Sequence, residues 1–344
     1  MIPVVSGRDY RIQLMTTKEL YRIYSEEVKR VGNKKKKTDI PLSITTINQI
    51  LAKWKIHHSK DTAQCPTCKF LKTYEGKPPP ANLEPAKLRK HQNKLLKHKN
   101  HKLIAQSQHN AFKTSKQKLI DTKSTNTMIV LHDFTQLNPQ SGFNQDMVVT
   151  LLTYDINAPD KIKHQYFHFI GEQHDKNDVF FVITVWEHML RNKIIGNNIK
   201  NIEIWSDGGG KHFKMKDAMF YFSTIKQNHN KQITYNFYQS YHGHNSCDAA
   251  ASHGKKAISN QQRNTNILIY TSTDLASAIN TIRNHTAQTV PKIITTKMNV
   301  SQMKGIKSYY KFTFPLPNRI HAFATSTSTQ PIKQWTVTGT LPTI

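Results

Sequence analysis

Acidic side chains are scarce in this sequence: 22 Asp and Glu stand against 49 Lys and Arg in 344 residues, a formal net charge of +27. Cysteine is scarcer still, and three residues of it exclude a disulfide framework and predict a reducing compartment. No run reaches about 18 consecutive apolar residues, so we expect no membrane-spanning helix and no membrane partner. The first ten residues lack a basic head followed by an apolar segment, so we expect no secretory signal. The 37% hydrophobic content argues against wholesale disorder.

The positive charge is concentrated in the first third of the chain. Residues 1–125 hold 27 basic and 9 acidic side chains, a net charge of +18. Only nine of the 49 basic residues are arginine, and lysine contacts phosphate as a point charge rather than reading base edges. The distribution predicts binding to a nucleic-acid backbone, with counterion release as the source of affinity. The alternatives are a basic protein without this role, and an anionic membrane surface, for which a clean basic amphipathic helix with an aromatic face is missing.

Apolar spacing predicts a helical DNA-binding region over residues 1–60. One helix is expected at residues 17–30 and a second at residues 43–54, with a run of four lysines between them. Two short helices around a basic turn are compatible with a small DNA-binding unit.

Residues 61–122 form the next predicted region, a Cys-x-x-Cys knuckle followed by a long basic helix. The helix is expected from Pro85 to about Leu119, rich in Lys and His. Its single narrow apolar stripe suits either a partner helix or a solvated arm.

From Asn126 onward the sequence contains short apolar runs typical of strands. We expect the order β β β α β α β α within residues 123–290, which is the order of the ribonuclease H-like fold. A further strand and helix are expected within residues 265–284, and residues 291–344 are expected to form a small β-rich segment. The predicted fold class is therefore α/β with a ribonuclease H-like mixed sheet, preceded by the basic helical region and followed by β structure. The strands are expected at residues 128–134, 147–154, 162–170, 199–206 and 232–241, and the helices at residues 177–191, 214–227 and 246–259.

Three aspartates lie at ends of these expected elements. Asp133 ends the first strand, Asp207 follows the fourth strand, and Asp248 opens the last helix. Converging carboxylates are the ligands that two hard cations need for phosphoryl transfer. Each aspartate also has a structural alternative, because Asp is a common turn and helix cap and Asp207 can simply start the glycine-rich loop. Glu187, within an apolar helix, either lines the site or faces solvent.

Basic and glycine residues surround these acids. Three glycines follow Asp207 and allow backbone to approach a phosphate closely. Nearby basic side chains can neutralise phosphates or move protons, or they are loop residues without a specific role. They are Lys211, His212, Lys214, His242 and His244.

Residues 131–256 carry the motifs LHDF, WSDGGGKHF and YHGHNSCDAAASHGKKA. With these motifs the region resembles the ribonuclease H-like catalytic domain of eukaryotic DDE/DDD transposases and proteins derived from them. Upstream, LSITTINQILAKWKIHHSKDTAQCPTCKF resembles the helical segment and Cys-x-x-Cys that precede that domain, so the similarity covers most of residues 40–256. One departure is that the third acid is Asp rather than Glu.

The resemblance implies a DNA-cleaving activity, the metal ions it uses and the residues that bind them. Asp133 and Asp207 would share one Mg²⁺ or Mn²⁺ ion, and Asp248 would complete a second site. A metal-bound water would cut one DNA strand, and the released 3′-hydroxyl would attack target DNA in line. We therefore expect a nuclear transposase or transposase-derived nuclease active in DNA recombination. The alternatives are a catalytically silent DNA-binding protein, and a ribonuclease H-like nuclease acting on RNA:DNA hybrids.

DNA is the expected partner, held mainly through its backbone, and a homodimer is left open. The expected contacts come from lysines in the four-residue run and around the aspartates. They are Lys34, Lys35, Lys36, Lys37, Lys211, Lys214, Lys255 and Lys256.

Cys65 and Cys68 have the spacing of a zinc knuckle, with turn residues between two thiols. We expect them to bind one structural zinc together with His91 and His98, although the six residues between these histidines exceed the usual spacing of about three to five. His101 is a further candidate that shares a helix face with His98. The alternative is a pair of reduced surface thiols.

Overall fold

The computed structural model describes residues 65–77, 83–135, 137, 146–171, 178–208, 212–243, 245–265, 269, 271–291 and 298–340. These residues belong to one compact unit, Cys65–Ile344. The helices expected at residues 17–30 and 43–54, the lysine run, Lys211 and His244 lie outside the described residues. Among the helices that are described, none has the length and apolar character needed to cross a membrane.

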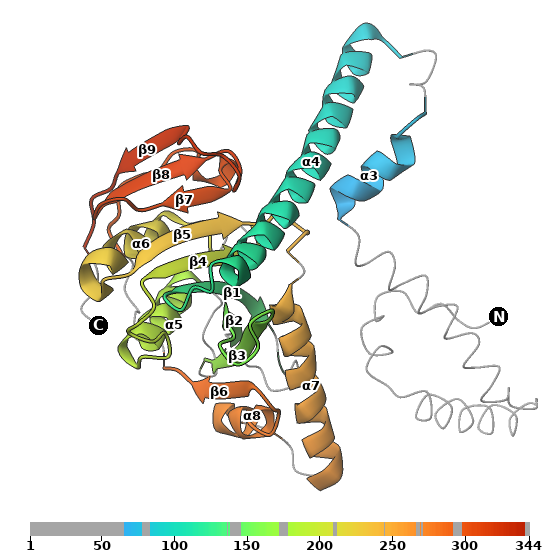
Figure 1. Cartoon of the computed structure of the whole chain (residues 1–344). Helices are drawn as coiled ribbons and strands as arrows, with labels where there is room; N and C mark the ends of the chain where they lie inside the picture. The colour runs from blue at the N-terminus through green and yellow to red at the C-terminus, as the bar shows by residue number, and fades with distance from the viewer. Residues whose placement is uncertain are drawn as a thin grey trace, which may run out of the picture. The chain divides into compact units, whose positions relative to one another are not determined.

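A mixed nine-stranded sheet lies at the centre of the described residues and confirms the predicted α/β class (Figure 1). The strands are β1 (Thr127–Thr135), β2 (Asp146–Tyr154), β3 (Ile162–Ile170), β4 (Asn201–Ser206), β5 (Gln232–Phe237), β6 (His285–Thr289), β7 (Lys311–Thr313), β8 (Arg319–Phe323) and β9 (Lys333–Thr336). Their order across the sheet is β6-β3-β2-β1-β4-β5-β7-β8-β9. Strand β1 runs antiparallel to β2 and parallel to β4, and β5 runs parallel to β4.

Six α-helices accompany the sheet in the described part of the chain. They are α3 (Pro66–Tyr74), α4 (Pro85–Asp121), α5 (Val179–Arg191), α6 (Lys216–His229), α7 (Ser246–Thr265) and α8 (Ser272–Ile279). Local sequence explains the starts of two of them. The side chain of Asp178 caps α5 by accepting hydrogen bonds from the backbone N–H groups of Phe180 and Phe181, each at 3.0 Å. Thr271 and Asp274 form a capping box at the start of α8.

Alternate residues of β1 are buried against different helices. Met128 and Val130 pack in a cluster with residues of α5 and α6. Ile129 and Leu131 pack in a second cluster with residues of α4 and α7. Because successive side chains of a strand point to opposite faces, both faces of the sheet are covered at β1. Burying each of these apolar side chains stabilises the fold by about 1.5–3 kcal/mol.

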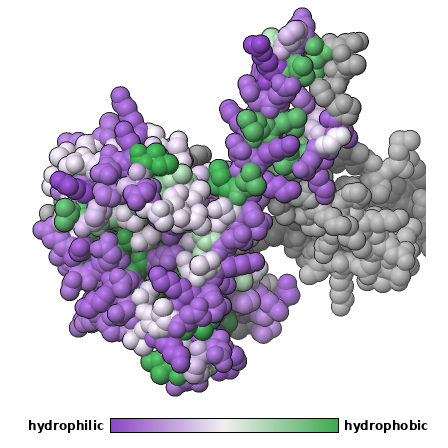
Figure 2. All heavy atoms as spheres, turned by 45° about the horizontal axis from the view of Figure 1, so that its top comes forward, coloured by the Kyte–Doolittle hydropathy of each residue, from purple (hydrophilic) through white to green (hydrophobic). Residues whose placement is uncertain are grey.

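Helix α4 is a packed helix in one half and a solvated arm in the other, the two alternatives that its sequence left open. Its C-terminal half packs on the sheet, and the hydroxyl of Ser115 donates a 2.6 Å hydrogen bond to Glu203 of β4. Its N-terminal half packs against α3 and exposes its lysines, and the face of the molecule seen in Figure 2 is mainly hydrophilic. The buried residues share one face and are His101, Ala105, Gln108, Ala111 and Leu119.

The β structure expected at residues 291–344 is present, and it belongs to the central sheet. Strand β7 pairs antiparallel with β5, so β7, β8 and β9 extend the central sheet. At the other edge, the short polar strand β6 pairs parallel with β3 and was not predicted. Most of the residues expected to form a strand after α7 lie outside the described residues.

Candidate functional site

Strand pairing brings Asp133 and Asp207 side by side. The parallel register of β1 and β4 runs from the pair Thr127 and Asn201 to the pair His132 and Ser206. Asp133 and Asp207 occupy the next position of this register. By strand alternation, Asp133 shares the face of Leu131, and that face is covered by α4 and α7.

Asp248 approaches this pair from the first turn of α7, a helix that packs on β1 and β2. Burial, then the charges of Asp207 and Asp248, raise the pKa of Asp133 to about 7. Asp207 and Asp248 are therefore both close enough to Asp133 to act on its charge. Asp248 is not the N-cap of α7, a position held by Asn245, but its Oδ2 accepts a 2.8 Å hydrogen bond from the backbone N–H of Asn245 and so helps to cap the helix.

The glycine after Asp207 is required by packing within the protein. A Cβ on Gly208 would lie 2.6 Å from the backbone oxygen of Tyr238, which is too close for any other residue. Close approach to a phosphate is therefore not needed to explain this glycine. The next two glycines lie outside the described residues.

Lys214 is the buried lysine beside the acids, with 3% of its surface exposed. Its Nζ lies 4.8 Å from the ring centroid of Phe237 and 4.6 Å from that of Tyr310. Burial lowers its pKa to about 8, against the opposing effect of Asp207. Lys214 is thus close enough to Asp207 for their charges to interact.

The lysines predicted on α7 have a different environment. Lys255 and Lys256 are exposed. Lys256 lines a groove between α7 and α8 together with His253, Asn260 and Arg283. These basic and amide side chains are suited to phosphate contacts.

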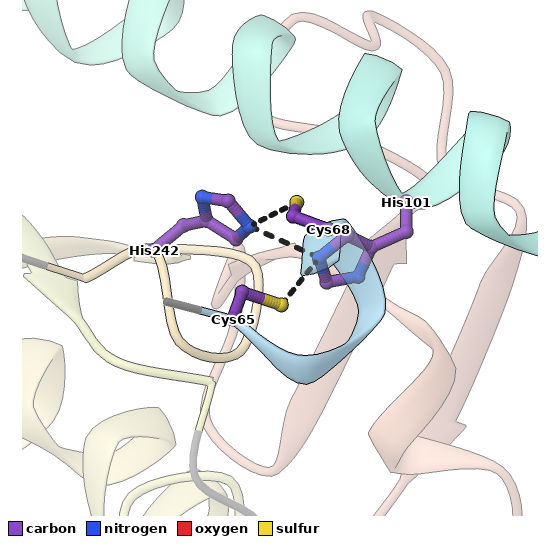
Figure 3. Close-up of side chains that lie close together, drawn as sticks. All are labelled: Cys65, Cys68, His101 and His242. Atoms are coloured by element: carbon purple, nitrogen blue, oxygen red, sulfur yellow. Dashed lines mark hydrogen bonds between the residues drawn. The ribbon is translucent and has the colours of Figure 1, made fainter. Parts of the chain in front are cut away.

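A second cluster joins Cys65, Cys68, His101 and His242, whose ligand atoms all lie within 4.8 Å of one another (Figure 3). Cys65 precedes α3 and Cys68 lies in its first turn, His101 belongs to α4, and His242 lies in the loop between β5 and α7. The Nε2 atoms of the two histidines are 3.0 Å apart. Cys65 Sγ is 3.2 Å from His101 Nε2, and Cys68 Sγ is 3.3 Å from His242 Nε2.

These separations fit the edges of a tetrahedral zinc site. With ordinary Zn–N and Zn–S bonds, two nitrogens lie about 3.3 Å apart, and nitrogen and sulfur about 3.6 Å apart. The three separations given above, out of the six edges of a tetrahedron, are within a few tenths of an ångström of these lengths. Two thiols and two imidazoles are also a donor set that zinc prefers.

The geometry corrects the predicted ligand set. His98 packs its ring on Phe70, with centroids 4.3 Å apart, and His91 lies against Tyr74 at 5.7 Å. Neither belongs to the cluster, because α4 is continuous and presents His101 to the thiols. His242 was predicted only as a basic residue near the acids, since its separation of 174 positions from Cys68 gives no local signal.

The cluster is partly shielded from water. Burial, followed by the neighbouring Cys65, raises the pKa of Cys68. Burial, followed by His242 and His98, lowers the pKa of His101 and favours the neutral imidazole that a metal requires. The side-chain amide of Gln239 lies 2.6 Å from His101 Nδ1 and fixes the orientation of the ring.

Two other buried carboxylates have different surroundings. Glu187 neither lines the acid site nor faces solvent, because it bonds to Arg191, Tyr221 and His229. Asp146, which sequence reasoning missed, accepts a 3.2 Å hydrogen bond from the backbone N–H of Leu137. Burial raises the pKa of Asp146 to about 7.

Comparison with known proteins identifies one family. No curated protein and no solved structure matches the chain. Residues 108–334 match a family model described as a domain of unknown function, DUF8701. The match includes the three aspartates and His242, whereas Cys65, Cys68 and His101 precede it. Because it spans about two thirds of the 344 residues, the chain belongs to the DUF8701 family.

Proposed function

We propose that this protein is a metal-dependent nuclease that cuts DNA and transfers the cut strand, with Asp133, Asp207 and Asp248 as its metal ligands. One observation carries the proposal: two aspartates in register on neighbouring parallel strands, with a third close enough to raise the pKa of Asp133. In a chain of net charge +27, such a gathering of acids is best explained by cations that bind there.

We include in this proposal that the α/β sheet is ribonuclease H-like. Its support is the element order β β β α β α β α from β1 to α7. The positions of Asp133, two residues before the end of β1, and of Asp207, directly after β4, support it as well. Similarity in the LHDF, WSDGGGKHF and HGHNSCDAAAS motifs to DDE/DDD transposases is the basis for proposing strand transfer in addition to cleavage.

Each residue has a defined part in this proposal. When bound, Mg²⁺ or Mn²⁺ supplies Lewis acidity toward the phosphate and charge neutralisation. The strands β1 and β4 hold two carboxylates at a fixed spacing, and the first turn of α7 supplies the third. Lys214 adds a fixed positive charge beside Asp207. Lysines on the surface, including Lys255 and Lys256, neutralise the DNA backbone.

Replacing Asp207 by Asn tests the proposal, because the amide keeps the shape and removes the charge. We expect Mg²⁺-dependent nicking of duplex DNA to fall more than about 100-fold, beyond the usual effect of losing an outer-shell contact. DNA binding should be unchanged. The measurement is plasmid nicking by the purified full chain, with Asp160→Asn, an exposed residue in the β2–β3 turn, as the matched control.

Unchanged nicking in Asp207→Asn would contradict the assignment. Wild-type protein that binds DNA without ever cutting it would favour the catalytically silent alternative. Parallel assays on duplex DNA, single-stranded DNA and RNA:DNA hybrid identify the substrate, and a strict hybrid preference would favour a ribonuclease H-like activity.

We also propose that Cys65, Cys68, His101 and His242 bind one structural zinc ion. The fit of their separations to a tetrahedral site supports this assignment. Elemental analysis of the purified protein should give about one zinc per chain. His101→Asn should lower this value to near zero, whereas His91→Asn, a change of the same kind on the same helix, should leave it near one. Zinc lost equally from both variants would disprove the ligand set.

A further inference from the structure

One loop connects the Cys–His cluster to the acid cluster. The loop follows β5 and ends at α7, and its residues His242 and Gly243 are neighbours in the sequence. His242 belongs to the Cys–His cluster. Gly243 lies against the side chain of Asp207. A displacement of His242 must therefore move a residue that touches an acid.

The contact between Gly243 and Asp207 is tight. A Cβ on Gly243 would lie 3.1 Å from the Cβ of Asp207 and 3.3 Å from its Oδ1. Even one methyl group would force the carboxylate to move by a few tenths of an ångström. Gly243 thus forms one wall of the space that Asp207 occupies.

The same loop reaches the third acid through hydrogen bonds. The side-chain nitrogen of Asn245 donates to the backbone oxygen of Gly243 at 2.6 Å. The backbone N–H of Asn245 donates to Asp248 at 2.8 Å, and its side-chain oxygen accepts from Cys247 at 2.7 Å. The start of α7, with Asp248, is therefore attached to the backbone next to His242.

We infer that zinc binding by the Cys–His cluster positions the acid site, with His242, Gly243 and Asn245 as positioning residues. This inference rests on the proposed nuclease function. Zinc would attach His242 to Cys65, Cys68 and His101, which lie more than a hundred positions earlier in the sequence. With His242 fixed, Gly243 confines Asp207 and Asn245 orients Asp248. Without zinc, the loop is free to open locally and the three carboxylates lose their common geometry.

Two variants separate zinc binding from loop geometry. Cys68→Ser removes a partly exposed ligand, and Gly243→Ala crowds Asp207 without changing any ligand. His91→Asn is the control, since it alters a histidine of α4 outside the cluster. Zinc content, hydrogen exchange of residues 238–248, Mn²⁺ affinity and Mg²⁺-dependent nicking are measured on the full chain. Zinc depletion of wild-type protein by a chelator, followed by readdition of zinc alone, provides the same comparison without a mutation.

We expect Cys68→Ser to lose zinc and to exchange faster in residues 238–248, with β1 and β4 unchanged. Its Mn²⁺ affinity and nicking should fall about tenfold or more, the scale of a lost outer-shell contact. Gly243→Ala should keep about one zinc per chain and lose Mn²⁺ affinity to a similar extent. Readdition of zinc to the depleted wild-type protein should restore Mn²⁺ affinity.

Zinc-free protein that binds Mn²⁺ and nicks DNA like the zinc-loaded form would overturn the inference. So would wild-type exchange rates in residues 238–248 of the zinc-free protein. Failure of the proposed nuclease function can be told apart from failure of this inference. In that case the wild-type protein would not nick DNA and would bind Mn²⁺ with the same affinity as Asp207→Asn.

Discussion

Glu187 is a buried carboxylate that is held in place by hydrogen bonds to three surrounding side chains. It lies on α5 with 6% of its surface exposed. Arg191 donates to its Oε1 at 2.6 Å, and Tyr221 and His229 lie 3.0 and 3.2 Å from its Oε2. Burial alone would raise the pKa of Glu187, but these hydrogen bonds outweigh it and lower the pKa to about 2. The folded state therefore favours the ionised form.

Replacing Glu187 by Gln should destabilise the protein by about 1–3 kcal/mol at pH 7, because three partners lose a charged acceptor. A carboxylate with a lowered pKa contributes stability above the pKa of the unfolded chain and loses it as the pH falls through the folded value. The difference between wild type and variant should therefore shrink from about pH 5 toward about pH 2, the folded pKa. Urea unfolding at several pH values measures it, and a difference independent of pH would contradict the argument.

The candidate site shows which residues a sequence can identify. Asp133 and Asp207 were predictable because each lies where an apolar strand run ends, and parallel strand ends meet at one edge of a sheet. Asp248 was predictable from its position at a helix start. His242 was not predictable as a metal ligand, because only the tertiary fold brings it to Cys68. Asp146 is the first residue of β2, and nothing in the sequence around it indicates that its carboxyl group is buried.

At the scale of elements, apolar runs predicted β1 to β5 and α4 to α7 well. Helix α5 is instructive because its sequence VFFVITVWEHMLR is rich in β-branched residues. It is nonetheless helical, since it is too long for an ordinary strand, has Asp178 as an N-cap and is buried on nearly all sides. Strand β6, with the sequence HTAQT, was missed because its polar residues carry no apolar alternation. Tertiary pairing with β3 alone makes it a strand.

Strands near the C-terminus show that sequence periodicity does not predict which strands pair. Strands β7, β8 and β9 were expected as a small β-rich segment, without a pairing partner. Pairing of Phe312 with Tyr235 joins them to the central sheet, and Phe312 is fully buried there. Sequence periodicity indicates a strand and one buried face, whereas the choice of a pairing partner depends on which edge the fold leaves open.

At the scale of the whole molecule, the positive charge and the acidic candidate site lie in different parts of the chain. Residues 1–125 carry +18 of the total +27 and include the exposed lysines of α4, while the acid cluster is formed by β1, the end of β4 and the start of α7. A basic surface attracts a DNA backbone over about a Debye length, roughly 10 Å at 0.1 M salt. The acids can accept the same polyanion only once cations neutralise them. Binding and cutting should therefore depend on different residues.

Salt dependence of DNA binding by the full chain tests this division. The triple change Lys90→Gln, Lys97→Gln and Lys99→Gln removes three exposed charges from the N-terminal half of α4. If each contacts a phosphate, the slope of log affinity against log salt should lose about 0.9 per contact, and affinity should fall for all duplex sequences alike. The matched control removes the same charge at three exposed lysines elsewhere, Lys161, Lys304 and Lys333. Titration of labelled duplex DNA at several salt concentrations measures both slopes. Equal slopes for the two triple variants would mean that net charge acts as a whole and that α4 has no special role in DNA binding.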